Sequence, residues 1–166
     1  MLPLTCIATL MDRSESQALK SLLEQTAVAA LATLHKAEPA VSMVPYALLP
    51  GTARFIIHVS QLATHTQDML AHPAVSLLVT AAPAPALSPL ALPRASVTGQ
   101  ARVCRPDEAD YATARAAYLA KLPDAEELFS FSDFSLFTIE PRALRYVAGF
   151  GRAMSLQAGQ LAALWA

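Results

Sequence analysis

Short apolar runs, each closed by a turn signal or a helix start, recur along this chain and limit the folds open to it. The runs have the length of strands, and most are joined by connections short enough for hairpins. They cover residues 27–34, 40–49, 54–59, 75–80, 94–103, 134–139 and 143–147. Helical segments do not alternate regularly with them, so a doubly wound parallel sheet is disfavoured. The pattern predicts a mainly β, α+β fold: an antiparallel barrel with peripheral helices.

Helix signals lie between and beside these runs. The predicted helices extend from Asp12 or Ser14 to about Gln25, from Thr64 to the residue before Pro73, from Pro106 to about Leu122, and weakly from Ser155 to Trp165. Asp12 and Glu15 have the spacing of a capping box, and so do Thr64 and Gln67. The segment 81–93 holds four prolines and is predicted to be a loop.

The composition excludes several classes of protein. Hydrophobic residues make up 54% of the 166 residues and charged residues 15%, against roughly 25% charged residues in an average globular domain, so disorder is excluded as the main state. Twelve basic and thirteen acidic residues give a net charge of −1. That balance lacks the basic excess that nucleic-acid binding requires. No apolar stretch reaches the roughly 18 residues of a membrane span.

Chain length, cysteine content and low charge bear on the organisation of the protein. A chain of this length is expected to form one domain, residues 1–166, with an N-terminal segment 1–26 that contains a helix and a tail 154–166. Two isolated cysteines, Cys6 and Cys104, fit a reducing compartment and predict a cytoplasmic protein. So few charges suggest that a partner covers apolar surface, and we expect an oligomer.

The segment Ser60–Thr66 joins the end of a predicted strand to the start of a predicted helix. The first turn of a helix presents free N–H groups and a partial positive charge, so it receives anions. Ser60, Thr64 and Thr66 add hydroxyl donors, and His65 adds a donor that can carry charge. A phosphate monoester fits such a corner. The alternative is that Thr64 only caps the helix while the other side chains face solvent.

Further candidates for binding lie on other segments. Pro45 interrupts the run Ser42–Tyr46, which is either an ordinary edge strand or turns backbone groups toward a planar heterocycle. Arg94 follows a proline-rich loop, and Arg152 follows a segment with two glycines. In a chain with few charges, an arginine next to two glycines suggests close approach to an anion or an electron-rich ring, and the alternative for both Arg94 and Arg152 is a surface cation. The four histidines do not cluster along the sequence, so no metal site is expected.

Several segments follow one another in an order that matches a known family. They are Ser42–Tyr46, Phe55–Thr66, His72–Leu78, Pro89–Gly99, Asp133–Phe137 and Gly149–Ala153. Together they resemble the pyridoxamine 5'-phosphate oxidase-like family of FMN-binding split barrels, and in particular a branch related to haem utilisation. The resemblance covers residues 27–153.

The resemblance implies a split β-barrel that works as a homodimer with FMN at the subunit interface, and with a small-molecule substrate or haem as a further ligand. It places the cofactor on Ser42, Val44 and Pro45 in the first flavin-contacting strand, on His58, Val59 and Ser60 at a strand end, and on Thr64, His65 and Thr66 at the phosphate corner. Arg94 matches a ring-contacting position from the neighbouring strand or subunit. Arg152 corresponds loosely to a late basic residue near the flavin.

The chain departs from the vitamin-making oxidases of this family. They carry an arginine and a lysine where it has Ser42 and Ala47, and an arginine–lysine pair where it has Thr64 and His65. The resemblance therefore implies an FMN-binding oxidoreductase that acts on another substrate. Two alternatives stay open. One is a haem-binding or haem-degrading protein on the same fold, although no histidine follows His72; the other is a non-catalytic dimer whose flavin pocket has degenerated.

Overall fold

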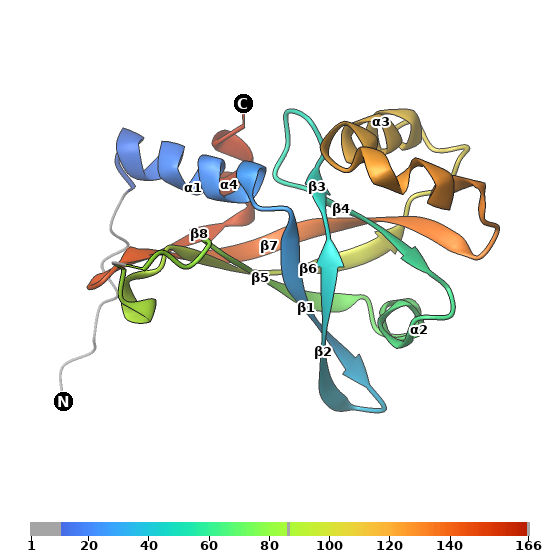
Figure 1. The fold of residues 1–166 in the computed structure, drawn as a ribbon, viewed down its shortest axis with the longest axis horizontal. Coiled ribbons are helices and arrows are strands. Elements are labelled where there is room, and N and C mark those ends of the chain that lie inside the picture. The colour runs from blue at the N-terminus through green and yellow to red at the C-terminus, as the bar shows by residue number, and fades with distance from the viewer. Residues whose placement is uncertain (1–10, 86, 166) are drawn as a thin grey trace.

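The computed structural model describes residues 11–85 and 87–165, and in it the strands form one antiparallel sheet (Figure 1). The strands are β1 (Val28–His35), β2 (Glu38–Pro45), β3 (Ala47–Leu48), β4 (Phe55–Ser60), β5 (Ala74–Thr80), β6 (Arg94–Val103), β7 (Phe134–Gly149) and β8 (Arg152–Gln157). Their order across the sheet is β2-β1-β5-β6-β7-β4-β3, and β8 pairs with β7. Figure 1 shows β1 and β2 crossing the direction of β6 and β7, so the sheet curls into an open half-barrel. The predicted antiparallel split barrel is confirmed.

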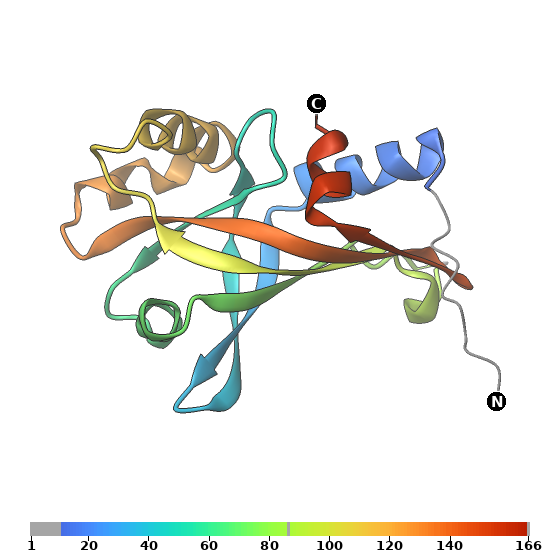
Figure 2. The same ribbon diagram turned by 180° about the vertical axis from the view of Figure 1, so that it is seen from behind.

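Helices flank the two ends of the sheet. They are α1 (Arg13–Gln25), α2 (Thr64–Ala71), α3 (Tyr111–Lys121) and α4 (Ala158–Ala163), with the 3-10 helices η1 (Pro89–Ala91) and η2 (Pro123–Ser130). Figures 1 and 2 show α1 and α4 near each other over one end of the long strands, and α3 over the other end. Within residues 11–85 and 87–165, no helix has both the length and the apolar character needed to cross a membrane.

Side-chain alternation along the strands sets the core. In β1, Ala29 and Leu31 are buried, whereas Val28 and Leu34 are exposed on the opposite face. The same period of two places Leu77 of β5 in the core. One face of the curled sheet is therefore closed by the core, and the other face of β1, β2 and β5 remains open.

The first helix forms as its capping residues predict. Asp12 accepts a hydrogen bond from the Glu15 N–H (2.9 Å), and the Glu15 carboxylate accepts one from the Asp12 N–H (3.0 Å). Leu19, Leu22 and Leu23 then face the sheet and are buried. The capping box and the apolar stripe of α1 are confirmed. The rest of the predicted N-terminal segment, residues 1–10, lies outside the described residues.

One long strand replaces the two that were predicted near the end of the chain. β7 continues without a break from Phe134 to Gly149, and Pro141 lies within it. Pro141 lies opposite Gly99, where the pairing of β6 with β7 shifts register at a bulge. A bulge tolerates a residue that has no N–H to donate. The separate strands 134–139 and 143–147 are therefore segments of one element.

Two helix boundaries also differ from prediction. α3 begins at Tyr111 and not at Pro106, because the N–H of Arg105 bonds to the Glu108 carboxylate (3.2 Å) in a turn that precedes the helix. The tail is not one helix, since β8 pairs with β7 before α4 begins. Met154 and Leu156 are buried with the period of a strand, which explains the difference.

A second, smaller core covers the outer face of β4. His58 of β4 stacks on Phe129 of η2 with ring centroids 3.8 Å apart, and the edge of His58 meets Tyr118 of α3. Burial, helped by the nearby charge of Arg115, lowers the pKa of His58 to about 4. The imidazole is therefore neutral at pH 7 and belongs to the packing between β4 and η2.

Replacing Gly99 with alanine should destabilise the protein, because a Cβ there would lie 2.6 Å from the carbonyl oxygen of Glu140 in β7. Moving the two backbones apart is expected to lower the free energy of unfolding by about 1–3 kcal/mol, measured by denaturant unfolding. Gly159→Ala in α4 is the matched control, since nothing lies within 4 Å of a Cβ at that position. A Gly99→Ala protein as stable as this control would contradict the close approach of β6 and β7.

Candidate functional site

The turn between β4 and α2 is held in shape by its own side chains. The Ser60 hydroxyl donates to Asp133 Oδ2 (2.8 Å) and accepts a hydrogen bond from the Leu62 N–H (3.1 Å). Thr66 is fully buried and donates its hydroxyl to the carbonyl oxygen of Ser60 (2.7 Å). The hydroxyl hydrogens of Ser60 and Thr66 are thus used inside the turn. Their role in the structure is to fix where α2 starts.

α2 begins without a side-chain cap. Its N-cap is Ala63, so the capping box predicted from Thr64 is wrong. The Thr66 N–H bonds to the carbonyl oxygen of Ala63 (3.0 Å). In the part of the chain that the structure describes, the N–H groups of Thr64 and His65 have no hydrogen-bond partner, and the side chain of Thr64 is exposed. Two free amides at the positive end of a helix can receive an anion.

A buried carboxylate fastens α2 to β1. Asp68 is 5% exposed, and its two oxygens accept hydrogen bonds from the Thr33 hydroxyl and from Nδ1 of His35, each at 2.8 Å. Burial alone raises the pKa of Asp68, but the hydrogen bonds from His35 and Thr33 outweigh it and hold the pKa below its usual value. This tie fixes the position of the helix start relative to the sheet.

The imidazole of His65, at the start of α2, is mainly neutral at pH 7. Burial lowers the pKa of His65, although the carboxylate of Asp68 works in the opposite direction. Its Nε2 atom is buried and has no hydrogen-bond partner among the described residues. The corner therefore offers backbone amides and a neutral imidazole to an anion.

β2 runs beside this corner as an edge strand of the sheet and contacts both α2 and β4. Val44 is buried in the core, Ser42 is half-buried and Pro45 is exposed. The edge position explains how the sheet tolerates Pro45. β2 and α2, which carry the predicted first flavin strand and the predicted phosphate corner, are thus in contact in the structure.

Most side chains at the end of β4 pack elsewhere and do not reach the turn between β4 and α2. The Val59 side chain belongs to the main core, and the His58 ring lies against Phe129. Of the three residues predicted there, Ser60 alone places its side chain in the turn. His58 and Val59 therefore contribute backbone and packing.

The two predicted arginines lie at the opposite end of the molecule. Ser60 pairs in register with Phe134, and Arg94 pairs with Val147, which is thirteen residues further along β7. At about 3.3 Å per residue, these positions are roughly 40 Å apart along the strand. One chain does not bring Arg94 and the β4–α2 turn to the same mononucleotide.

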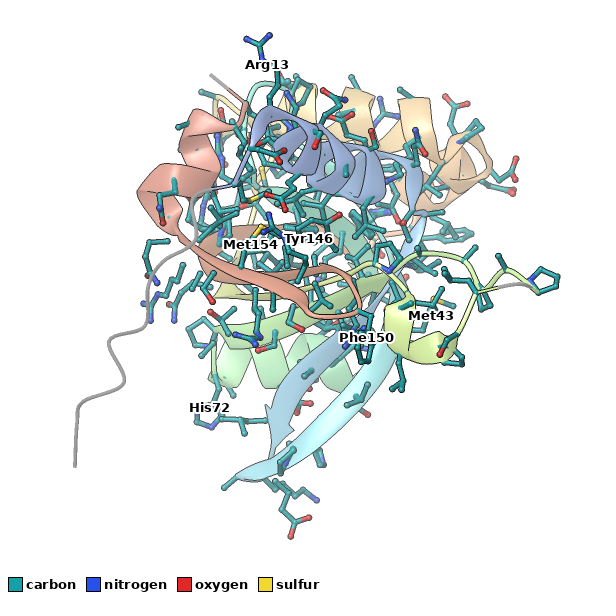
Figure 3. All side chains as sticks on the ribbon, turned by 90° about the vertical axis from the view of Figure 1, so that its left-hand side faces the viewer. Arg13, Met43, His72, Tyr146, Phe150 and Met154 are labelled. Carbon is teal, nitrogen blue, oxygen red and sulfur yellow. The ribbon has the colours of Figure 1, made fainter. Side chains whose placement is uncertain are left out.

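Arg94 and Arg152 share a separate cavity of about 410 Å³ near the hairpin between β7 and β8. Arg94 donates to the carbonyl oxygen of Leu92 (3.0 Å), and Arg152 forms an ion pair with Glu15 of α1. Figure 3 shows Phe150 at the tip of this hairpin, where it is 83% exposed. The cavity thus combines positioned guanidinium groups with an exposed aromatic ring.

Sequence reasoning missed the residues that position the corner. Asp133 is 73 residues from Ser60 in the chain and receives its hydroxyl hydrogen bond. From the sequence, Asp68 was only a residue within a short predicted helix. In the structure it is buried, and its hydrogen bond with Thr33 fastens that helix to β1. The motif around Asp133 was the one available signal for the first contact, and no local pattern indicated the second.

The open face of the sheet is apolar. Met43 of β2, Ala30 of β1 and Leu78 of β5 are direct cross-strand neighbours, and Met43 and Leu78 are exposed. Val41, also exposed, lies on the same face of β2. A soluble chain seldom leaves so large an apolar surface uncovered, so this face is a candidate interface.

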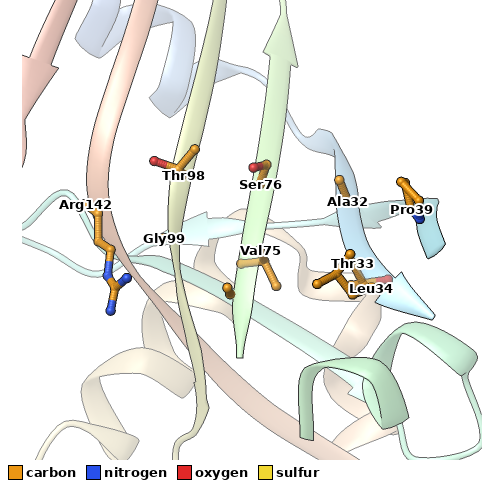
Figure 4. A pocket seen from close by; sticks show the side chains of 10 residues that line it. Ala32, Thr33, Leu34, Pro39, Val75, Ser76, Thr98, Gly99 and Arg142 are labelled. Atoms are coloured by element: carbon orange, nitrogen blue, oxygen red, sulfur yellow. The ribbon is translucent and has the colours of Figure 1, made fainter. Parts of the chain in front are cut away.

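Small side chains leave a shallow groove of about 390 Å³ on the same face (Figure 4). Ala32, Ser76 and Thr98 lie in register across β1, β5 and β6 and form its floor. Arg142 of β7 lies at one side of the groove, as Figure 4 shows. The open face therefore combines the exposed side chains of Met43 and Leu78 with a groove where the side chains are small.

Comparisons with known proteins support one family. A family model described as pyridoxamine 5'-phosphate oxidase matches residues 16–148. The chain is 40% identical over 115 residues to the non-canonical heme oxygenase HOZ of Arabidopsis thaliana chloroplasts, which is 69% of this chain and 33% of that protein.

Solved structures agree with this result. A heme binding protein from Mycobacterium smegmatis superposes with a TM-score of 0.81 at 31% identity, over 93% of this chain and 62% of that one. The heme storage protein HutZ from Vibrio cholerae shares the fold, with a TM-score of 0.67 at 20% identity over 75% of this chain and 88% of the other.

The chain spans about a third of the length of the plant relative and less than two thirds of the mycobacterial one. The family model nevertheless covers most of the half-barrel, from within α1 to near the end of β7. The chain therefore belongs to the pyridoxamine 5'-phosphate oxidase family, and its similarity is to the haem-related members of that family.

Proposed function

We propose that this protein is an FMN-binding flavoprotein that acts as an oxidoreductase on a small molecule, in a homodimer with FMN at the subunit interface. The observation that carries the proposal is the uncapped start of α2, where the amides of Thr64 and His65 are free beside the edge strand β2. A terminal phosphate accepts hydrogen bonds from such amides and is favoured by the helix dipole.

Thr64 adds an exposed hydroxyl to these amides, while Ser60 and Thr66 hold the turn in place. Asp68 keeps the helix start at a fixed position against β1. Preorganised donors of this kind bind an anion without paying the ordering cost at the time of binding. The residues present thus fit a phosphate, although they lack an arginine or a lysine.

A second copy of the chain completes the proposed site. The apolar sheet face around Met43 and Leu78 is the surface that a second copy would cover. Arg94 then approaches the flavin from the partner, because within one chain it lies at the far end of β7. In the proposal, Ser42 and Pro45 of β2, which are half-buried and exposed, contact the ring, and Val44 supports them from the core, where its side chain is buried.

Bound FMN supplies the electron or hydride transfer. The chain's own residues bind the phosphate, orient the ring and exclude water from it. A guanidinium near the pyrimidine end favours the reduced, anionic ring; Arg94 has this role in the proposal. Arg152 is the weaker candidate, since Glu15 already holds its guanidinium. We further propose a cytoplasmic location: Cys104 is free and buried, and Cys6 lies outside the described residues.

Thr64→Pro tests the phosphate corner. Proline removes the amide hydrogen at the first helical position, and the preceding Ala63 already has the extended backbone (φ −74°, ψ 137°) that a following proline requires. We expect FMN affinity to fall about tenfold, the effect of one charge-assisted hydrogen bond, while riboflavin affinity stays unchanged. Fluorescence titration with both flavins measures this.

Thr64→Ala is the control for that variant, because it removes the hydroxyl and keeps the amide. It should weaken FMN binding less than Thr64→Pro does. Equal losses for FMN and riboflavin, or no loss of FMN affinity in Thr64→Pro, would show that the phosphate does not bind at this helix start.

Met43→Glu tests the interface. A carboxylate at a position that is 66% exposed in one chain would be buried without a partner in the dimer, which is unfavourable. The mass in solution should fall from twice the 17.6 kDa of the chain toward that of one chain, and FMN should be lost with it. Ala112→Glu, on the exposed side of α3, should change neither. A Met43→Glu protein that stays dimeric would argue against this face.

Haem binding is the second candidate function, and the haem-related relatives favour it. Hemin titration followed at the Soret band tests it, with His65→Ala as the variant because the His58 ring lies under η2. A Soret shift that His65→Ala abolishes would support haem at the same corner. Hemin that causes no shift, in a protein that binds FMN, would exclude this candidate.

A further inference from the structure

Lys121, the last residue of α3, carries an amine that the proposed function does not use. Its Nζ atom donates a hydrogen bond to the carbonyl oxygen of Thr26 (2.7 Å), the C-cap residue of α1. The same atom lies 4.2 Å from the centre of the Tyr46 ring. The Tyr46 hydroxyl in turn donates to the carbonyl oxygen of Leu23 (2.7 Å), which fixes the ring. The amine is therefore held at one position between α3 and the end of α1.

A cavity of about 300 Å³ lies beside this amine. Its lining comes from α1, β3 and α3: Glu24, Ala47, Leu48, Ala117, Ala120 and Lys121. β3 contacts both helices, and Figure 1 shows it between them. None of the lining residues belongs to the open face of β1, β2 and β5. The volume is at the lower end of the range of about 300–1,000 Å³ that is typical of small-molecule sites, so the cavity has room for a small ligand.

The surroundings of Lys121 favour the neutral amine more than water does. Burial lowers the pKa of Lys121 to about 8, while the negative charge of Glu24 and the face of the Tyr46 ring work in the opposite direction. At pH 7 about a tenth of the amine is then neutral, against about 0.03% at the usual lysine pKa. The carbonyl oxygen of Thr26 accepts a hydrogen bond from either form, so the neutral amine keeps its position. A desolvated, neutral lysine is a nucleophile, because its lone pair is free.

We propose that Lys121 forms an imine with a small aldehyde that enters this cavity, so that the lysine is a site of covalent modification. The lone pair of Nζ attacks the carbonyl carbon and forms a C–N bond. The two hydrogens of the amine then pass to the carbonyl oxygen, which leaves as water when the C=N bond is complete. The reaction needs no oxidant or reductant. The site uses no residue of the proposed flavin corner, so either assignment can fail without the other.

Reductive trapping with propanal tests this proposal on the full chain. Cyanoborohydride reduces the imine to a stable secondary amine, and peptide mass spectrometry then gives the initial rate of labelling at each lysine. The chain has three lysines, so Lys20 and Lys36 are internal controls. Lys36 is exposed in the turn between β1 and β2, and Nζ of Lys20 lies 5.6 Å from the centre of the Trp165 ring.

Lys121 should be labelled about tenfold faster than Lys36 at pH 7, because more of its amine is neutral. This difference should become small at about pH 10, since the amines of exposed lysines also lose their protons there. Labelling of Lys121 that is no faster than that of Lys36 at pH 7 would overturn the proposal.

Ala120→Leu tests whether the reaction needs the cavity. Leucine suits this exposed position of α3 and fills the cavity without changing the lysine. It should slow the labelling of Lys121 about fivefold, because the aldehyde no longer fits beside Nζ, and leave Lys36 unchanged. Ala116→Leu is the matched control, since Ala116 is exposed on α3 but does not line the cavity, and should change neither rate. If Lys121 keeps its rate in Ala120→Leu, the amine reacts from solvent and the cavity is not the site.

Discussion

The continuous pairing of β7 with β4, β6 and β8 is the constraint on which the rest of the structure depends. β7 carries the β4–α2 turn at one end and the arginine cavity at the other. Because a strand is nearly straight and inextensible on the scale of a ligand, these two ends cannot meet within one chain. The position of the proposed flavin site then follows: it needs one end from each of two chains.

The open sheet face fits the same account. The chain has only 15% charged residues. The exposed positions around Met43 and Leu78 carry apolar side chains, where charged side chains would be expected on a surface that faces water. In the proposed dimer, a second copy would remove this apolar area from water, which would stabilise the pair. The proposed dimer would therefore explain both the low charge of the chain and the uncovered sheet face.

Local signals in the sequence predicted local structure well. Asp12 and Glu15 predicted the start of α1 because both partners of the capping box lie within one turn. The bounds of β6 were also predicted, since Pro93 precedes it and the period-two pattern is regular. The free amides at Thr64 and His65 follow from the strand-to-helix transition, which the sequence indicated.

Predictions failed where a distant residue decides the structure. Residues 134–139 and 143–147 were predicted as two strands, but the bulge at Gly99 of β6 accommodates Pro141 and lets one strand continue. Thr64 was expected to cap α2, yet α2 already starts from Ala63, next to the turn that Ser60 and Asp133 hold. No local pattern could report these contacts.

Mixed dimers test most directly whether two chains share one site. Thr64→Pro removes the backbone N–H that is proposed to bind the phosphate, and Arg94→Ala removes the guanidinium that the partner is proposed to supply. Each variant alone should therefore bind FMN weakly. In a co-expressed mixture, half of the dimers combine one chain of each kind and regain one intact site, so about a quarter of all sites should bind FMN tightly. If no tight sites return in the mixture, the site is not shared and the account is wrong.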